Sequence, residues 1–354
     1  MKYIKSSKLL LENNEKFCSI LPYNIEWIDL DFLKLSNTNE VFSFLDSNYI
    51  EDSESMFRFH YIHEFIALGL KAPGWSPFLN IALKYKRGRK LIGLITSIPK
   101  EIIINNNLLC APDINFLCLS KKIRNKRFVG IVIQEIRRRL NLTGITKAIY
   151  TTGLKLHKSM FSCNYYHYPI NSHKLMTLGF LSRINRKKYK LIKQKNNQLS
   201  EKQNETNYKL IRKKNFPFKT YRYFKTIDFL YWFRTLPGVI YLINLNQLNS
   251  IFNQEIFTFY SLPSKFITNQ KNIFLYGIYS YYKTGVFLND DIFLLIIEII
   301  KKVGFDIINI LECEKNKKKL SRINFNKGTG KLNYHIFNYK NQRIKSDENR
   351  LEFF

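Results

Sequence analysis

The chain has 354 residues, of which 45% are hydrophobic, so it can form one large domain or two of ordinary size around a buried core. Its 57 Lys and Arg against 27 Asp and Glu give a formal net charge of +30. This charge suggests a polyanionic partner, namely a nucleic acid, an anionic membrane or a phosphate-rich cofactor; the alternative is codon bias, with single lysines outside motifs as incidental solvated surface. The five cysteines include no CxxC pair, which argues against a disulfide framework or a zinc site and fits a reducing cytosol.

Membrane insertion is not expected. The start, MKYIKSSKLLLENNEK, has too short an apolar run for a signal peptide. The longest apolar stretch, Ile292 to Ile300, is too short to span a bilayer and predicts a buried helix. We therefore expect a soluble, cytoplasmic protein.

Residues 91–140 carry the clearest local pattern. LIGLITSIP (91–99) predicts a strand, EIIINNNLLC (101–110) a hairpin around Asn105–Asn107, and DINFLCLS (113–120) a second strand. FVGIVIQEIRRRL (128–140) predicts an amphipathic helix with one apolar face, formed by Phe128, Val129, Val132, Ile136 and Leu140.

The basic segment KKIRNKR (121–127) lies directly before that helix. A helix N-terminus has free N–H groups and a partial positive charge, so with cationic neighbours it can hold a diphosphate. An ordinary solvated basic turn explains this segment equally well by itself. The order of strand, hairpin, strand, basic loop and helix is similar to that of acyl-CoA-binding acetyltransferase-like folds.

Later in the chain, the polar stretch 193–206 predicts a surface loop or linker. Segments 238–243, 255–262 and 272–282 predict strands. DDIFLLIIEIIKKVG (290–304) predicts a helix with an acidic start, a basic end and Gly304 as its stop.

Several longer motifs occur in the order found in N-myristoyltransferases, and the chain resembles that family closely over 21–185 and more loosely over 228–354. They are SNYIEDSESMFRF (47–59), KAPGW (71–75), DINFLCLSKKIRNKR (113–127), AIYTTG (148–153), CNYYHYPINSHKL (163–175), LSR (181–183), FYSLPS (259–264) and GTGKLNYHIFNY (328–339). The resemblance implies a mixed α/β fold in which two acetyltransferase-like halves form a saddle-shaped sheet flanked by helices. Residues 1–168 would bind acyl-CoA, and residues 169–354 would bind the peptide.

The resemblance also implies the reaction. Myristate would pass from myristoyl-CoA, a co-substrate, to the N-terminal glycine amine of peptides or nascent proteins, without a bound cofactor or metal. The amine would attack the thioester directly, with the main-chain amides of Phe116 and Leu117 as oxyanion hole and the C-terminal carboxylate of Phe354 as base. Asn115 and Thr151 would lie beside the glycine amine.

Binding residues follow from the same motifs. Acyl-CoA would contact Phe116, Leu117, Cys118, Leu119, Arg124, Asn125, Lys126, Arg127, Phe128, Val129 and Gly130. The peptide would contact Tyr49, Glu51, Asp52, Glu54, Phe57, Tyr165, His167, Ser264, Gly328 and Gly330. A structural role is the alternative for His167, which would otherwise bond a substrate serine. We expect Cys118 to be a buried strand residue rather than a nucleophile, because no histidine is paired with it.

Two departures from the family pattern stand out. Thr329 occupies a position that is usually Asp between two glycines, and residues 1–20 have no clear match to the segment that covers acyl-CoA in the family.

The alternatives are another acyl-CoA-dependent N-acyltransferase or an inactive homologue that binds acyl-CoA and peptide. A nucleic-acid-binding protein is a further alternative, against which Lys and Arg are spread along the chain without an RRM or helix-turn-helix pattern. The basic surface also suggests a ribosome contact.

Overall fold

The computed structural model of the chain describes residues 20–49, 57–154, 156, 159–180, 218–244, 256–267, 272–283, 290–313, 316–340 and 344–351. Predictions for the 193–206 linker and for Glu51, Asp52, Glu54 and Phe354 fall outside these residues.

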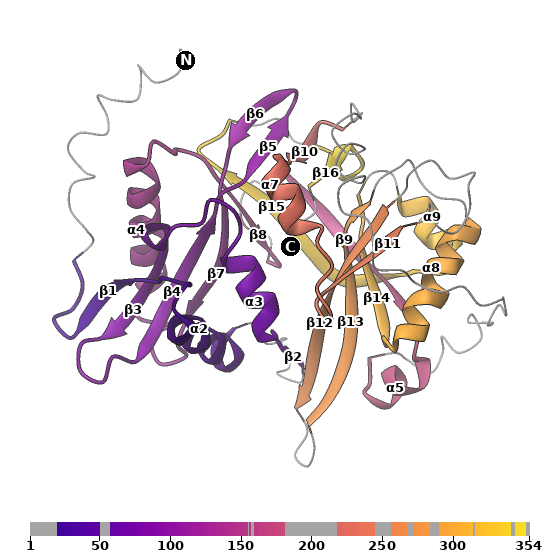
Figure 1. Cartoon of the computed structure of the whole chain (residues 1–354), viewed down its shortest axis with the longest axis horizontal. Coiled ribbons are helices and arrows are strands. Elements are labelled where there is room, and N and C mark those ends of the chain that lie inside the picture. The colour runs from indigo at the N-terminus through magenta and orange to yellow at the C-terminus, as the bar shows by residue number, and fades with distance from the viewer. Residues whose placement is uncertain are drawn as a thin grey trace.

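A large mixed sheet is the central layer of the described structure (Figure 1). Its strand order is β1-β3-β4-β7-β8-β15-β9-β14-β13-β12-β11, and β2 pairs with β12. Pairs β7–β8 and β13–β14 are parallel and the other pairs are antiparallel. The strands are β1 (Ile25–Asp29), β2 (Phe57–Phe59), β3 (Asn80–Tyr85), β4 (Leu91–Ile98), β7 (Asp113–Leu119), β8 (Ala148–Thr152), β9 (Phe161–Pro169), β11 (Ile240–Asn244), β12 (Ile256–Ile267), β13 (Asn272–Lys283), β14 (Ile307–Leu311) and β15 (Asn326–Phe337).

A smaller sheet has the order β16-β10-β5-β6. It consists of β5 (Glu101–Ile104), β6 (Asn107–Cys110), β10 (Thr220–Tyr223) and β16 (Asn349–Arg350). The predicted hairpin is confirmed as β5–β6. Asn105 and Asn106 form its turn with φ of 47° and 65°, a left-handed conformation that asparagine tolerates better than most residues.

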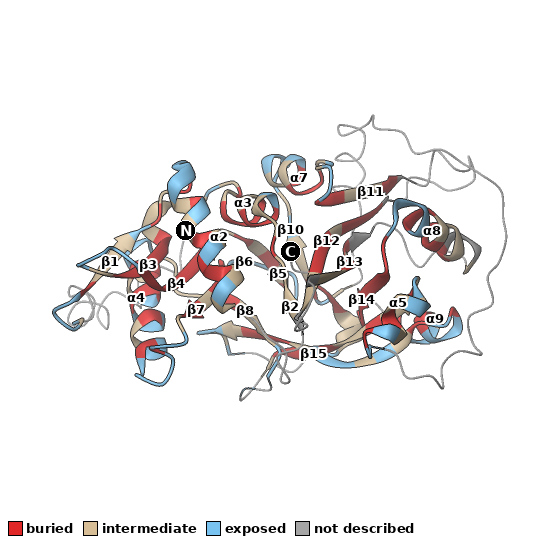
Figure 2. Ribbon diagram, turned by 90° about the horizontal axis from the view of Figure 1, so that it is seen from below, coloured by how far each residue is buried: buried red, intermediate tan, exposed pale blue. Residues whose placement is uncertain are grey.

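Helices cover both faces of the large sheet (Figure 2). On the β3–β4–β7 part, α4 packs on one face and α2 and α3 on the other, whereas α8 and α9 pack beside β9, β13 and β14. The helices are α2 (Leu35–Asn48), α3 (His63–Leu70), α4 (Phe128–Leu142), α5 (Ser172–Thr177), α7 (Thr226–Trp232), α8 (Asp290–Val303) and α9 (Lys317–Arg322), with short 3-10 turns η1 (Pro77–Leu79) and η4 (Ser346–Glu348). The predicted mixed α/β fold with one large sheet between helices is confirmed; the boundary between residues 168 and 169 stays a prediction.

The predicted apolar faces of α4 and α8 are confirmed, with one correction in α4. Phe128, Val132, Ile136 and Leu140 are buried as expected, but Val129 is 40% exposed. Periodicity places Val129 on the apolar face, yet the first turn of α4 lies beside a cavity, which Val129 lines. In α8 the apolar face is buried, and Gly304 follows its end with φ of 98°.

Strand lengths were less well predicted than strand positions. The strand expected at 238–243 begins at Ile240, after a turn in which Gly238 has φ of 75°. The strands expected at 255–262 and 272–282 are parts of the longer pair β12 and β13.

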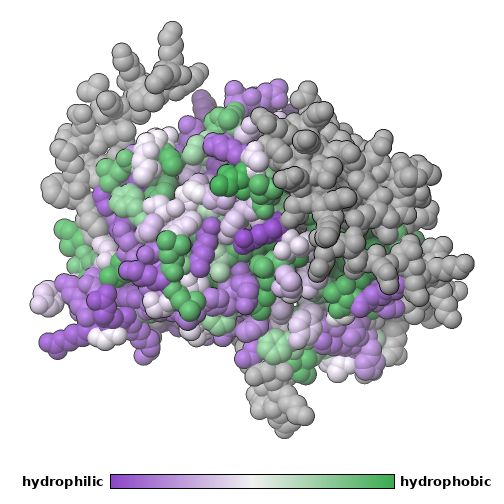
Figure 3. Space-filling model, viewed as in Figure 1, coloured by the Kyte–Doolittle hydropathy of each residue, from purple (hydrophilic) through white to green (hydrophobic). Residues whose placement is uncertain are grey.

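Hydrophilic and apolar residues alternate in small patches over the face shown in Figure 3. Within the described ranges, no helix combines the length and the apolar character needed to cross a membrane.

Candidate active site

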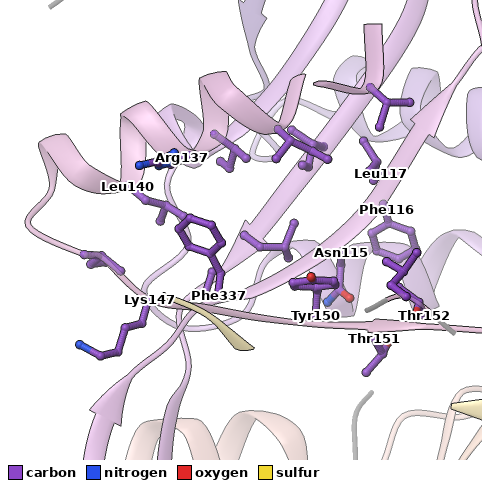
Figure 4. Close-up of a pocket in the computed structure, with 18 of the residues that line it drawn as sticks. Asn115, Phe116, Leu117, Arg137, Leu140, Lys147, Tyr150, Thr151, Thr152 and Phe337 are labelled. Atoms are coloured by element: carbon purple, nitrogen blue, oxygen red, sulfur yellow. The ribbon is translucent and has the colours of Figure 1, made fainter. Parts of the chain in front are cut away.

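The site forms where two parallel strands separate. β7 and β8 pair only at Asp113 and Ile149, and the strands then diverge. Asn115 and Thr151 each lie two residues beyond this vertex, so they share a face with Asp113 and Ile149 respectively. Figure 4 shows Thr151 projecting from β8 on the side opposite Tyr150.

A β-bulge interrupts β7 just beyond Asn115. In the ladder with β4, Thr96 pairs with Asn115 and Leu94 with Cys118, so Phe116 and Leu117 together oppose a single residue. Phe116 has φ of 49°, which is rare for a bulky side chain and is retained only where the surroundings fix it.

Aromatic packing fixes this bulge from one side. The ring of Phe116 lies 5.6 Å from that of Tyr49 and 5.9 Å from that of Tyr61, measured between centroids. A bulge leaves backbone groups out of the regular ladder, and the aromatic cluster packs against Phe116 at the point where this happens.

A cavity of about 500 Å³ lies between α4 and the diverging strands, a size suited to a small-molecule group (Figure 4). Several predicted residues meet in its wall: Tyr49, Asn115, Phe116, Leu117, Val129 and Thr151. The wall also contains residues that were not predicted, namely Arg137, Lys147, Tyr150 and Phe337. The Arg137 guanidinium lies 5.4 Å from the centre of the Phe337 ring, so cation and ring form one lining surface.

The basic loop between β7 and α4 is anchored by Ile123, which is buried, while Arg124, Asn125, Lys126 and Arg127 are exposed. Arg124 donates hydrogen bonds to the carbonyls of Leu119, at 3.1 Å, and Asn48, which tie the loop to the end of α2. Arg127 caps α4 with φ of 61° and makes no side-chain cap hydrogen bond. A Cβ added at Gly130 would meet nothing within 4 Å, so the first turn of α4 has open space beside it.

The remaining predicted acyl-CoA residues of β7 and α4 point into the core. Cys118, Leu119 and Phe128 are buried. Burial raises the pKa of the Cys118 thiol to about 12, although Arg124 acts in the opposite direction. A thiol with this pKa is protonated at neutral pH and is a poor nucleophile.

A buried ion pair lies at the vertex of the diverging strands. Lys100 Nζ is 2.6 Å from Asp113 Oδ2, and each side chain is 3% exposed. Burial lowers the pKa of Lys100 from its usual value and Arg222 adds to this effect, whereas the close contact with the Asp113 carboxylate opposes it and favours the charged amine. This pair was not predicted from the sequence.

A second group of predicted residues meets at β9 and β15. His167 and Tyr165 stack with their rings 12° apart. His167 Nδ1 is 2.6 Å from Asn309 Oδ1, and the Asn309 amide nitrogen donates to the Ile278 carbonyl. The Asn309 oxygen must therefore accept from Nδ1–H, which leaves His167 Nε2 as an acceptor. Burial lowers the pKa of His167, so the neutral ring is favoured.

Gly328 and Gly330 lie in a bulge that faces this histidine. The β9–β15 register places Gly328, Thr329 and Gly330 opposite Tyr165 alone. A Cβ at Gly328 would overlap His167 Nε2, whereas at Gly330 it would make an ordinary contact with Tyr165 at 3.8 Å. Glycine at 328 therefore lets the backbone of β15 pass close to His167 without a side chain overlapping the ring.

The substitution Gly328→Ala should raise KM for an acceptor peptide while acyl-CoA affinity stays unchanged. The added methyl group displaces the His167 ring from its hydrogen bond with Asn309. Steady-state kinetics and calorimetry would measure the two effects. Gly330→Ala is the matched comparison and should cause a milder change; equal changes in both variants would contradict the assignment of His167.

The other predicted peptide residues lie around the same region. Ser264 of β12 pairs with Phe59 of β2, the strand that begins at Phe57. Tyr61 is within electrostatic reach of both Tyr49 and Tyr165, so it connects the cavity residues to the His167 group. The described residues include no cluster of three or more His, Cys, Asp or Glu that could hold a metal ion.

Comparisons with known proteins agree with this arrangement. The N-terminal domain model of myristoyl-CoA:protein N-myristoyltransferase matches residues 4–163, and the C-terminal domain model matches residues 173–352. A glycylpeptide N-tetradecanoyltransferase of Plasmodium falciparum is 32% identical over 338 residues, which cover 90% of this chain and 80% of that protein. Glycylpeptide N-tetradecanoyltransferase 1 of Arabidopsis thaliana is 31% identical, with 92% and 78% covered. The crystal structure of Saccharomyces cerevisiae N-myristoyltransferase with bound myristoyl-CoA superposes with a TM-score of 0.84 at 27% identity, over 95% of this chain and 88% of that one.

Proposed function

Because this chain belongs to the myristoyl-CoA:protein N-myristoyltransferase family and is therefore an acyltransferase, we propose that it transfers myristate to the N-terminal glycine amine of proteins by direct attack on the thioester. The observation that carries this mechanism is the bulge at Phe116 and Leu117, two residues that line a cavity at the point where β7 and β8 diverge.

Acyl-CoA binds on the α4 side of the sheet. The amides of Phe128 to Gly130 begin α4 and, with Lys126 and Arg127, suit the diphosphate. Arg124 shapes the loop through its bonds to backbone carbonyls and adds its charge. The cavity then receives the pantetheine arm and directs the thioester to the bulge.

The amides of Phe116 and Leu117 stabilise the oxyanion that forms on the thioester carbonyl. One preorganised donor in an acyl transfer contributes roughly 3–4 kcal/mol. Preorganisation comes from the packing of Phe116 against Tyr49 and Tyr61, which holds the strained backbone before the substrate arrives.

The glycine amine approaches from the opposite face, beside Asn115 and Thr151, and the carboxylate of Phe354 takes its proton. The course of the chain supports this role. β16 pairs with β10, and Leu351, 1% exposed, packs in the same buried cluster as Ile149 at the vertex. The three remaining residues can reach about 10 Å further when extended.

Peptide specificity resides at β9, β12 and β15. His167 Nε2, the ring nitrogen not bonded to Asn309, accepts a hydrogen bond from a substrate serine hydroxyl. Thr329 carries no charge, so preference for a basic residue depends on Glu51, Asp52 and Glu54. Residues 1–168 hold acyl-CoA and also supply His167 and the acidic residues to the peptide site, whereas residues 169–354 serve mainly the peptide. We place the protein in the cytoplasm, where nascent chains and a ribosome contact through the basic surface supply its substrates.

Replacing both Arg124 and Arg127 with Ala should weaken acyl-CoA binding far more than peptide binding. Removal of one charge-assisted hydrogen bond to the diphosphate costs roughly 1.5–3 kcal/mol. Calorimetry with a nonhydrolysable acyl-CoA analogue measures the effect, and Arg87→Ala, at an exposed arginine of the β3–β4 turn, is the control. If the double variant binds acyl-CoA with unchanged affinity, the basic loop does not hold the diphosphate and is an ordinary solvated turn.

Two alternatives are separated by simple observations. Another acyl-CoA-dependent N-acyltransferase would use acetyl-CoA, whereas this chain should require a long acyl donor. An inactive homologue would bind acyl-CoA and peptide without forming product.

A further inference from the structure

The ion pair between Lys100 and Asp113 has no part in the mechanism above, yet it lies at the vertex of β7 and β8, two residues along β7 from Asn115. The 2.6 Å contact joins the corner between β4 and β5 to the first residue of β7. Both side chains are 3% exposed, so the carboxylate of Asp113 has lost almost all its water. A buried carboxylate acts strongly on any nearby positive charge.

Distance along the strands places this carboxylate close to Asn115 and Thr151, where the proposed function brings the acceptor amine. Asn115 and Thr151 lie two residues beyond Asp113 and Ile149, about 7 Å further along each strand. Asp113 and Asn115 share one face of β7. On the proposed function, the incoming glycine ammonium meets Asn115 and Thr151 and must lose its proton there before it can attack.

We propose that Lys100 is a positioning residue that neutralises Asp113, so that this carboxylate does not hold the glycine in its ammonium form. The inference rests on the proposed function. An unpaired Asp113 would attract the ammonium and compete with the Phe354 carboxylate for its proton. Paired with Lys100, it leaves the amine free to become the nucleophile.

Other charged or titratable groups near the pair do not replace Lys100. Arg222 of β10 lies within electrostatic reach of both partners, but it also interacts with Asp228 of α7 and with Tyr281 of β13, and it packs on the rings of Phe224 and Trp232. Tyr49, at the end of α2, is within reach of Asp113, and its phenol is neutral because burial raises its pKa. Among the described ion pairs, Lys100 is the cation in direct contact with Asp113.

The test compares the pH dependence of kcat for a glycine peptide in the full chain and three variants. Lys100→Met should raise the pH of half-maximal kcat by roughly one unit, because Asp113 is left unpaired. Lys100→Met combined with Asp113→Asn removes both charges and should restore the original pH. Lys100→Arg keeps the charge and should behave like the unaltered chain. Acyl-CoA affinity, measured by calorimetry, should stay constant throughout.

A purely structural role predicts a different pattern. It would lower kcat equally at every pH, and the double variant would be no better than Lys100→Met; either result overturns the inference. If Lys100→Met does not fold, the Asp113→Asn variant provides the test. Its pH of half-maximal kcat should equal that of the unaltered chain or be lower. A higher value would contradict the inference. Absence of any turnover by the unaltered chain would overturn the proposed function as well, whereas normal turnover with an unshifted Lys100→Met profile overturns this inference alone.

Discussion

A short peptide tag added after Phe354 should abolish turnover while acyl-CoA still binds. Leu351 is buried in the same cluster as Ile149, and on the proposed mechanism the Phe354 carboxylate lies in the core beyond it, so added residues would have to fit there as well. They would also displace the Phe354 carboxylate that we propose as the proton acceptor. General-base assistance contributes roughly 100- to 10,000-fold, and kcat should fall by that factor.

The pH dependence identifies the cause of this loss. At high pH a larger fraction of the glycine amine is already neutral, so the difference between tagged and untagged protein should shrink. The control is a tag of the same length inserted at Gly88, in the exposed β3–β4 turn, which should leave kcat unchanged. A C-terminally tagged protein that folds and turns over normally would show that the proton leaves by another route.

Removal of the Leu117 main-chain N–H should cause the second large loss. Replacing Leu117 with its α-hydroxy acid changes one amide to an ester and keeps the side chain. Loss of a single oxyanion donor should lower kcat roughly 100- to 1,000-fold, with little change in acyl-CoA affinity.

The matched control is the same replacement at Ile114, in the regular part of β7 next to the bulge. The Ile114 variant loses an N–H group of the regular strand, so it should lose at least as much stability as the Leu117 variant, and thermal unfolding measures this loss. Equal kcat values for the two ester proteins would show that the bulge does not bind the oxyanion.

Local sequence patterns predicted the elements around the site well. The β5–β6 hairpin, β7 and α4 follow from asparagines that tolerate a left-handed turn and from helical spacing of apolar residues. These signals depend on neighbours in the chain, which is why they needed no knowledge of the fold.

The features that make the site reactive depend on contacts between distant segments. Nothing local favours φ of 49° at Phe116; the conformation requires Tyr49 and Tyr61, which precede it by more than fifty residues. The exposure of Val129 depends on where β7 and β8 separate, and helical periodicity carries no information about that point.

Pairing across the sheets explains two further residues that were not predicted. The β5–β6 hairpin lies between Lys100 and Asp113 in the sequence, and its pairing brings the two side chains together. Asn309 orients His167 because β14 pairs with β9 in that register. In the order β8-β15-β9, the last long strand of the chain lies between two earlier ones. Local sequence patterns do not predict such an order.

Mass spectrometry of an acceptor peptide after incubation with myristoyl-CoA tests the proposed transferase activity directly. A peptide beginning Gly-x-x-x-Ser should gain one myristoyl group at its N-terminal amine. The same peptide beginning with Ala should remain unmodified, because a side chain would crowd the approach of the amine to the thioester. Equal acylation of both peptides, or no acylation of the glycine peptide, would contradict the assignment.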